Sequence, residues 1–280
     1  SVAILDPKSS DKFPIKQTKV EELSKGKTLI KKTYKGQVIG WPGNMTGADV
    51  IEFMIKKAAA APKGVDVTTG YNYPQLISKF AMGAVFYNQA CTNYLGDKKL
   101  SSGSKPNDAP YKKGAKYTGK EHVWDEAFGY WGAAAHTLTL SPKESYEVAK
   151  KKNLTAADYN KDGVVDAGTE MTYAHAYYAS GFDKGGKTNY LETVTRAFLT
   201  GRETITSAGG QKLGWNGRNS GKGIIKQAAV ICSNWEKVIA EAVFKYAGSV
   251  YKDLENMKEN TDDAKMFGKY VKHWGELKGF

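Results

Sequence analysis

Apolar residues recur three and four positions apart in two long segments, which is the spacing of an α-helix with one buried face. The first segment begins near Pro74 and ends at Gly96, and the second begins after Gly223. We expect the two helices to pack against each other in the core of a bundle. The first stripe contains Ile77, Phe80, Ala84, Tyr87, Cys91 and Tyr94, and the second contains Ile225, Ala228, Cys232, Trp235, Ile239, Ala242 and Tyr246.

Capping signals predict where other helices begin. Thr46, followed three residues later by Asp49, precedes an apolar stripe that starts at Val50. The run Ser-Pro-Lys-Glu at 141–144 combines an N-cap, a first-turn proline and a capping-box glutamate. Further helices are expected over about 120–135, 170–180, 188–204 and 262–277, with long loops over 97–120 and 207–223.

The predicted fold class is mainly α, a bundle of about seven or eight helices with long loops. Alternating residues around Lys35 and Gly36 also predict a short hairpin within residues 28–41. Residues 1–27 are polar and lysine-rich, without a sustained period, which is typical of an extended arm. We therefore expect an N-terminal arm with a hairpin over 1–45 and a helical bundle domain over 46–280, with an inserted loop segment at about 141–185.

Cysteine usage and the first residue bear on the compartment. Cys91 and Cys232 lie on the two apolar stripes, so small buried thiols are the favoured interpretation, and a disulfide between the helices is the alternative. The chain begins at Ser1 rather than at a methionine, which favours removal of a leader. We expect an exported protein that is periplasmic, associated with the outer membrane, or extracellular. No apolar run approaches the roughly 20 residues that cross a bilayer.

The formal net charge of +12 indicates attraction to polyanions, such as an anionic polysaccharide or a membrane surface. The lysines are scattered along the chain, which favours a solvated basic surface as the explanation of the charge. Nucleic acid is not an expected partner, because no zinc finger, RNA-recognition signature or basic helical stripe accompanies the charge.

Residues 158–170 carry oxygen-bearing side chains at alternate positions, with Gly163 at the turn, as an EF-hand calcium loop does. Calcium takes six to eight oxygen ligands, and clustered carboxylates repel each other less once it is bound. Position twelve is Thr169 rather than glutamate, and the acid comes one residue later. A surface loop rich in Asx turns is the alternative. The expected calcium ligands are Asp158, Asn160, Asp162, the carbonyl of Val164, Asp166 and Glu170.

Two histidines have carboxylates three or four residues away, on the same helical face. His122 precedes Asp125 and Glu126, and His273 precedes Glu276. A histidine with carboxylates at this spacing can ligate iron or another transition metal. A buried network that braces the neighbouring aromatic residues is the competing interpretation. His136 and His175 complete the histidines of the chain, and His175 lies in an aromatic run for which core packing is expected.

Three segments together resemble a family of bacterial exported proteins and lipoproteins that is similar to the imelysin-like proteins. They are 122–130 (His-Val-Trp-Asp-Glu-Ala-Phe-Gly-Tyr), 82–87 (Met-Gly-Ala-Val-Phe-Tyr) and 273–280 (His-Trp-Gly-Glu-Leu-Lys-Gly-Phe). The resemblance covers roughly 71–280, apart from the calcium-like loop. It implies a helical bundle outside the cytoplasm with a link to iron uptake through a Gly-x-His-x-x-Glu motif. His273 and Glu276 match the last part of that motif, while Val271 stands where the glycine is expected.

The sequence does not favour an enzyme, because it contains no His-Glu-x-x-His run, no Gly-x-Ser-x-Gly elbow and no Walker loop. Two functional classes remain. The first is an exported metal-binding protein, imelysin-like, that acts in iron acquisition and carries a structural calcium site. The second is an extracellular structural or surface-assembly protein that binds calcium and anionic glycans and self-assembles, with the basic arm contacting a neighbouring subunit or glycan.

Overall fold

The computed structural model describes residues 14–24, 28–100, 105–208, 223–259 and 263–280. In this part of the chain the fold is mainly helical, as the sequence predicts, and the sheet consists of two paired strands, β1 (Val65–Asp66) and β2 (Tyr71–Asn72). The chain forms two compact units, one of residues 1–28 and 89–238 and the other of residues 29–88 and 239–280. The division falls inside two helical elements.

The described residues contain eleven α-helices, more than the seven or eight expected. The difference comes from three helices of four residues each, which are too short to show a hydrophobic period. They are α1 (Val20–Leu23), α4 (Asp97–Leu100) and α7 (Leu154–Ala157).

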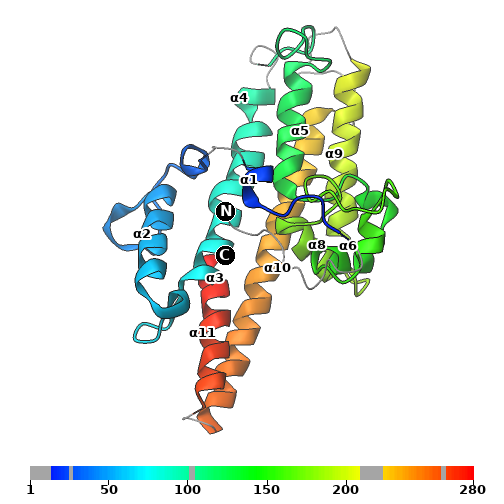
Figure 1. Cartoon of the computed structure of the whole chain (residues 1–280). Helices are drawn as coiled ribbons and strands as arrows, with labels where there is room; N and C mark the ends of the chain where they lie inside the picture. The colour runs from blue at the N-terminus through cyan, green and yellow to red at the C-terminus, as the bar shows by residue number, and fades with distance from the viewer. Residues whose placement is uncertain (1–13, 25–27, 101–104, 209–222, 260–262) are drawn as a thin grey trace. The chain divides into compact units, whose positions relative to one another are not determined.

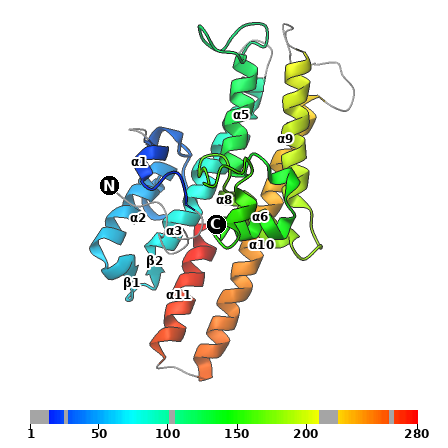
Figure 2. The ribbon, with the colours of Figure 1, turned by 45° about the vertical axis from the view of Figure 1, so that its right-hand side comes forward.

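The first unit is built on α5 (Gly119–Trp131), which packs against α8 (Ala174–Asp183) and α9 (Tyr190–Ser207). The helix α6 (Pro142–Ala149) covers α8, and the short helix η6 (Thr137–Thr139) lies against α9. Figures 1 and 2 both show α5 and α9 side by side. The largest fully buried side chains of this unit are mainly tryptophan and aliphatic, which is the composition of a well-packed core. They include Trp124, Trp131, Ile205, Ile231 and Trp235.

In the second unit α3 (Tyr73–Ala81) lies between α2 (Gly47–Ala60) and α11 (Ala264–Gly279). The strand β2 also lies against α11. The core between α2 and α3 consists of Val50, Met54, Tyr73 and Leu76. Three short helices belong to the same unit: η2 (Ile30–Lys32) and η3 (Pro42–Asn44) precede α2, and η4 (Pro62–Gly64) follows it.

The capping signals fix the helix starts that the sequence predicts. The hydroxyl of Thr46 accepts a hydrogen bond from the Asp49 amide, and the Asp49 carboxylate accepts one from the Thr46 amide. Ser141 and Glu144 exchange the same pair of bonds at α6. Such reciprocal caps satisfy backbone donors that the first turn leaves without partners.

The prediction of a hairpin within residues 28–41 is wrong. This stretch contains η2 instead of strands, because its backbone pairs with other segments rather than with itself. The Tyr34 amide donates to the Ala84 carbonyl at 2.8 Å, and the Tyr34 carbonyl accepts from the Gly47 amide at 3.0 Å. The hairpin lies further along, in β1 and β2, where Val65 faces Asn72.

The helix expected from Pro74 to Gly96 is present, but its second half, η5 (Met82–Tyr94), is a π-helix. The π-turn has a longer period than the α-turn. The buried positions there are Met82, Val85, Gln89, Ala90 and Tyr94. Of the predicted stripe in this half, Tyr94 is buried, and Ala84, Tyr87 and Cys91 are only partly buried. In α10 (Ile224–Glu259) four of the seven predicted stripe positions, Ala228, Trp235, Ala242 and Tyr246, are buried, while Ile225, Cys232 and Ile239 are only partly buried.

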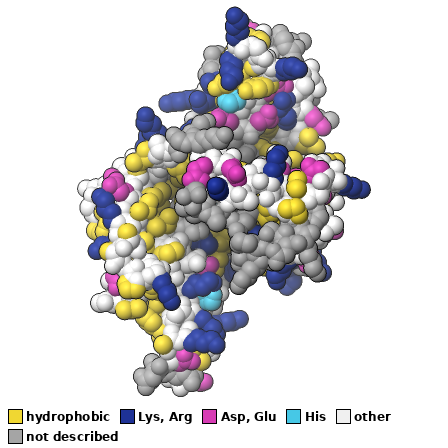
Figure 3. Space-filling model, in the orientation of Figure 1, with side chains coloured by type: hydrophobic (Ala, Val, Ile, Leu, Met, Phe, Trp, Pro, Cys, Tyr) yellow, Lys and Arg dark blue, Asp and Glu magenta, His cyan; other side chains and the backbone are white. Residues whose placement is uncertain are grey.

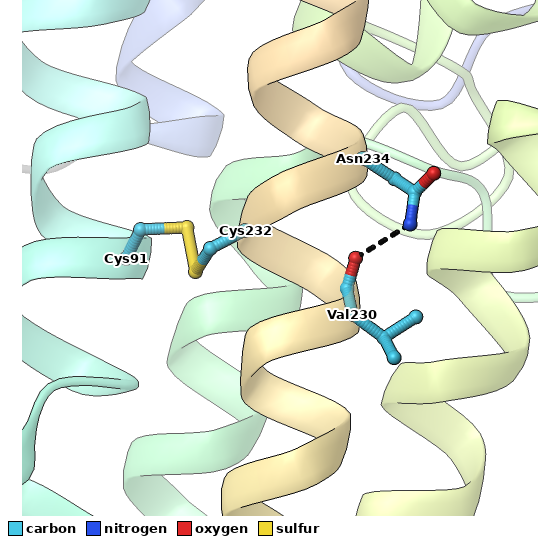
Figure 4. The surroundings of a disulfide bond; sticks show 4 residues. All are labelled: Cys91, Val230, Cys232 and Asn234. Atoms are coloured by element: carbon cyan, nitrogen blue, oxygen red, sulfur yellow. Dashed lines mark hydrogen bonds between the residues drawn. A yellow bond between two sulfur atoms is a disulfide. The ribbon is translucent and has the colours of Figure 1, made fainter.

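A disulfide joins Cys91 of η5 to Cys232 of α10, with the two Cα atoms 5.7 Å apart (Figure 4). The favoured interpretation of two free buried thiols is therefore wrong, and the alternative is correct. Both residues are only partly buried, so an oxidant can reach them more readily than core thiols. Beside Cys232, the Asn234 side chain donates to the Val230 carbonyl at 2.8 Å.

Among the described helices, none combines the length and the apolar character that a membrane crossing requires. Of the expected loop at 207–223, residues 209–222 lie outside the described residues, as do residues 1–13 of the expected arm.

Substitution of Gly201 should reveal how closely α5 and α9 approach. A Cβ at Gly201 would overlap the ring of Trp124, which is buried and donates from Nε1 to the Phe198 carbonyl at 2.8 Å, so the ring cannot retreat. We expect Gly201→Ala to lower the free energy of unfolding by about 1–3 kcal/mol, as overpacking does. Urea denaturation followed by circular dichroism measures this.

The matched control is Gly248→Ala in α10, where a new Cβ meets nothing within 4 Å. Its free energy of unfolding should stay the same or rise by up to about 1 kcal/mol, because alanine favours the helix. Equal stability of the two variants would contradict the close approach at Gly201.

Candidate calcium loop and histidine clusters

The calcium-like loop is held in a turn by hydrogen bonds from its own backbone. The Asp158 carboxylate accepts from the amides of Asp162 and Gly163, at 3.2 and 3.1 Å. The Asn160 oxygen also accepts from Asp162, and the Asp162 carboxylate accepts from the Val164 amide. These bonds require left-handed backbone at Gly163, with φ of +83°, which glycine adopts without steric cost. The acids are therefore fixed side chains of one tight turn.

Glu170 closes this loop although it stands one position beyond the standard closing acid. Its side chain is buried, with 6% of the residue exposed. One carboxylate oxygen accepts from the amides of Tyr159 and Asn160, and the other accepts from the Asp166 amide at 2.8 Å. The helix expected from 170 begins only at Ala174, which leaves Glu170 free to turn back across the loop.

Part of the N-terminal arm lies against the loop, which the sequence did not indicate. Ile15 and Val165 form a short parallel bridge. In it the Lys16 amide donates to the Val165 carbonyl, and the Val165 amide donates to the Pro14 carbonyl, each at 2.9 Å. Gln17 and the Ala167 amide form a further hydrogen bond at 2.8 Å. Polar, aperiodic sequence around these residues gives no signal of such pairing.

The carboxylate of Asp166 is held by the arm. It accepts hydrogen bonds from Lys16 Nζ at 3.0 Å and from the side-chain amide of Gln17 at 3.1 Å. Partial burial works to raise the pKa of Asp166, but the bonds from Lys16, Gly168 and Gln17 outweigh it and hold that pKa below its usual value. Asp166 therefore differs from the other loop acids, because its charge is balanced by a lysine.

An apolar cluster supports the loop from beneath. It joins one arm residue to residues of α6, of α7 and of the loop itself, so the loop cannot move independently of the arm. The cluster contains Ile15, Val148, Leu154, Ala157, Val165, Ala167 and Met171. His136 lies beside it, with Nε2 3.0 Å from the Ala156 carbonyl and its ring stacked on Tyr159.

The carboxylates of the loop are not gathered around one point. Within the described residues, no group of three or more His, Cys, Asp or Glu side chains stands in an arrangement that could hold a metal ion. In the loop each acid instead faces backbone amides or, for Asp166, the arm.

At the start of α5, His122 and Glu126 come together, with His122 Nε2 3.6 Å from the nearer carboxylate oxygen. The His122 ring is stacked on Tyr111 at a centroid distance of 3.8 Å. The pKa of Tyr94 is raised well above its ordinary value, mainly by burial and also by a hydrogen bond to Glu126. Glu126 thus has a histidine and a tyrosine as neighbours.

Asp125 is directed away from this pair. Its carboxylate binds Arg202 Nε of α9 at 2.9 Å, and Nη1 of the same guanidinium binds Glu121 at 2.6 Å. A single arginine therefore links two acids of α5 to α9. Arg202 carries no signal in the sequence, because its ion pair with Asp125 joins positions 77 residues apart.

In the second unit, His273 and Glu276 have different partners. His273 Nδ1 lies 2.6 Å from a carboxylate oxygen of Asp253 in α10. Glu276 is buried and accepts from the Tyr246 hydroxyl at 3.2 Å, with Lys272 Nζ also at 3.2 Å. The His-x-x-Glu spacing is thus used for two separate pairings between α10 and α11.

His175 lies in the core, as expected. No part of it is exposed, and its ring meets Trp235 edge to face. Burial lowers the pKa of His175 to about 3, so the ring is neutral at physiological pH.

Comparisons with known proteins give one match. No curated protein and no solved structure matches the chain, and no finding links it to the imelysin-like proteins. A family model described as a domain of unknown function, DUF4856, matches residues 63–267. This range covers more than half of the 280 residues and includes the calcium-like loop, His122 and the disulfide. The chain therefore belongs to the DUF4856 family.

Proposed function

We propose that this protein is an exported, non-enzymatic binding protein whose first unit is stabilised by one calcium ion in the loop at 158–170. The observation that carries the proposal is the position of Glu170. Its carboxylate is buried and reaches back to both ends of the loop, which supplies the closing acid that position twelve lacks. A buried carboxylate at such a place is expensive unless its charge is compensated.

The loop has the ligand chemistry that calcium prefers. Each carboxylate oxygen that accepts one backbone hydrogen bond retains further lone pairs for a cation. Calcium tolerates irregular geometry and six to eight oxygens, so side-chain rotation within the formed turn is sufficient to gather them. The direct ligands of the calcium ion would be the side chains of Asp158, Asn160, Asp162 and Glu170 and the carbonyl of Val164. Asp166 would bind through water, because Lys16 and Gln17 hold its carboxylate.

The disulfide supports the export part of the proposal. Disulfides persist in oxidising compartments and are rare where glutathione keeps thiols reduced. Cys91 and Cys232 lie 141 residues apart in the sequence and are the two cysteines of the chain. A crosslink over such a distance restricts the unfolded chain strongly, and its stabilisation is about 2–5 kcal/mol.

Calcium should raise the melting temperature of the chelator-treated protein and release or absorb measurable heat on titration. At a hundredfold excess over the dissociation constant the gain is about 2.7 kcal/mol. Glu170→Gln should abolish most of this response, because an amide offers one neutral acceptor in place of a bidentate carboxylate. The control is Glu144→Gln, which alters a capping acid of α6 and should leave calcium binding unchanged. A wild-type protein without heat of binding or a shift in melting temperature contradicts the calcium site.

If the protein is exported, Cys91 and Cys232 should be joined by the disulfide in the cells that produce it. Cells lysed with a thiol-blocking reagent should yield a protein in which a single peptide pair links Cys91 to Cys232, measured by mass spectrometry without reduction. The same cells supply the control, since a cytoplasmic protein with two cysteines should be blocked at both. Recovery of this protein with both thiols blocked would contradict export.

A transition metal at His122 and Glu126 is the second candidate, in line with the iron role that the imelysin resemblance implies. It is favoured by one distance, the 3.6 Å between His122 Nε2 and Glu126 Oε2, since two ligands of one metal lie about 3 Å apart. Against it, Asp125 is bound to Arg202, and the His122 ring packs on Tyr111.

His122→Ala separates a metal ligand from a packing residue. If His122 is a ligand, the variant loses its iron or zinc and keeps most of its stability. If the ring braces the packing, metal content is unchanged and the free energy of unfolding falls by about 2–4 kcal/mol. The stacking on Tyr111 leads us to expect the second result. Metal analysis and urea denaturation measure both quantities, and His273→Ala provides the same comparison for the second unit.

A further inference from the structure

Three aromatic rings are stacked at the end of the first unit where α5 begins. Tyr111 and Tyr117 belong to the loop at 105–118, and His122 belongs to the first turns of α5. The centroid distances are 3.8 Å between Tyr111 and His122, 5.9 Å between the tyrosines and 5.8 Å between Tyr117 and His122. The three planes lie within 27° of one another. We refer to these three residues as the aromatic platform.

The platform remains accessible to a ligand. Tyr111 keeps 38% of its surface exposed and Tyr117 keeps 36%, whereas most tyrosines that pack in pairs elsewhere in this unit, such as Tyr178, are more deeply buried. Rings that are already stacked lose little conformational entropy when a further planar or ring-shaped group packs on them.

Hydrogen bonds hold the loop under the platform in one conformation. The Tyr111 amide donates to the Tyr117 carbonyl at 2.9 Å, next to a bridge between Pro110 and Thr118. Asn107 anchors the base of the loop, because its side chain is buried and donates to the Ile205 carbonyl at 2.9 Å while it accepts from the Thr118 hydroxyl. The platform is therefore preorganised rather than a feature of a loose loop.

Exposed lysines accompany the two tyrosines in their loop, while the carboxylate of Glu126 lies 3.6 Å from Nε2 of His122. The described part of the loop carries four lysines, Lys105, Lys112, Lys113 and Lys116, against one acid, Asp108. Lys112, Lys113 and Lys116 are exposed. Figure 3 shows lysine and arginine side chains beside hydrophobic and histidine side chains over the end where α5 begins, with some acidic side chains among them. The combination of exposed aromatic surface and clustered ammonium groups complements an anionic ligand that also offers flat apolar faces.

We propose that the aromatic platform binds an acidic polysaccharide whose sugar units carry carboxylates. The apolar face of a pyranose ring packs on the tyrosines, and the carboxylates pair with Lys112, Lys113 and Lys116. Single-stranded nucleic acid has a comparable combination of charge and flat rings. The choice of a polysaccharide rests on the proposed export, because acidic polysaccharides are the polyanions met outside the cytoplasm.

Calorimetry with three probes tests the proposal: a galacturonic acid oligomer, neutral dextran and an oligothymidylate. All titrations contain chelator, so that calcium does not bridge protein and sugar. We expect the wild-type protein to bind the galacturonate oligomer more tightly than either other probe. The variant Lys112→Ala, Lys113→Ala, Lys116→Ala should bind it at least about tenfold more weakly and with a smaller salt dependence. Tyr117→Ala should weaken binding about fivefold with the salt dependence unchanged, because it removes stacking area and no charge.

The matched control removes the same charge elsewhere in the first unit, by Lys187→Ala, Lys226→Ala, Lys237→Ala, three exposed residues. It should change the affinity less than about twofold, because none of the three belongs to the loop of the platform and exposed charges act only over about 10 Å. Equal losses in the two triple variants would show that only net charge matters and would overturn the platform. Stronger binding of oligothymidylate, equal binding of dextran, or no binding of galacturonate would overturn the polysaccharide.

These results are independent of the calcium titration and of the mapping of the thiols. Failure of the loop to bind calcium leaves the galacturonate measurement intact, and free thiols in the source would overturn export without altering the affinities.

Discussion

The close approach of α5 and α9 at Gly201 is the constraint on which the first unit depends. The ring of Trp124 fills the space that a larger residue at 201 would occupy, and its indole nitrogen is bonded to the backbone of α9. This contact fixes the rotation of α5 about its own axis. The same rotation directs Asp125 and Glu121 toward Arg202, and leaves His122 on the side where Tyr111 packs. The candidate chemistry of α5 is therefore a consequence of how this helix is packed.

A second constraint is the compensation of acidic charge in the loop at 158–170. Backbone amides of the turn and Lys16 of the arm each balance part of this negative charge. The most buried carboxylate of the loop is that of Glu170, which accepts hydrogen bonds from amides at both ends of the loop. Backbone dipoles stabilise an anion less completely than a full positive charge does. The loop is thus formed and internally bonded, yet it retains a chemical reason to take up a divalent cation. Calcium would complete an existing structure rather than fold a disordered one.

The two proposed binding sites share a physical logic but not their chemistry. The loop offers oxygen atoms on a tight turn, whereas the aromatic platform offers apolar ring faces and ammonium groups on a hydrogen-bonded loop. Both are preorganised by short-range bonds on the surface of one unit, which reduces the entropy lost on binding. Neither proposed site requires a catalytic group.

The sequence by itself determined the features that arise from local hydrogen bonds and from regular periods. Thr46 and Ser141 cap helices as predicted, four residues of the predicted stripe in α10 are buried, and His175 lies in the core. The oxygen-rich turn at Gly163 also follows from its sequence, because Asx bonds join residues two to five positions apart. Such contacts are determined by neighbours along the chain, and a single sequence records them directly.

The tertiary structure alone decided which distant residues meet. The pairing of Cys91 with Cys232, of Arg202 with Asp125 and of Lys16 with Asp166 joins positions 77 to 150 residues apart. In η5 the buried residues include Met82, Val85 and Ala90, whereas Ala84, Tyr87 and Cys91 of the predicted stripe are only partly buried. The backbone of Tyr34 bonded to Ala84 and Gly47 in place of a local hairpin. Local sequence does not record these contacts, because a contact between remote residues forms only where the segments that carry them already lie together.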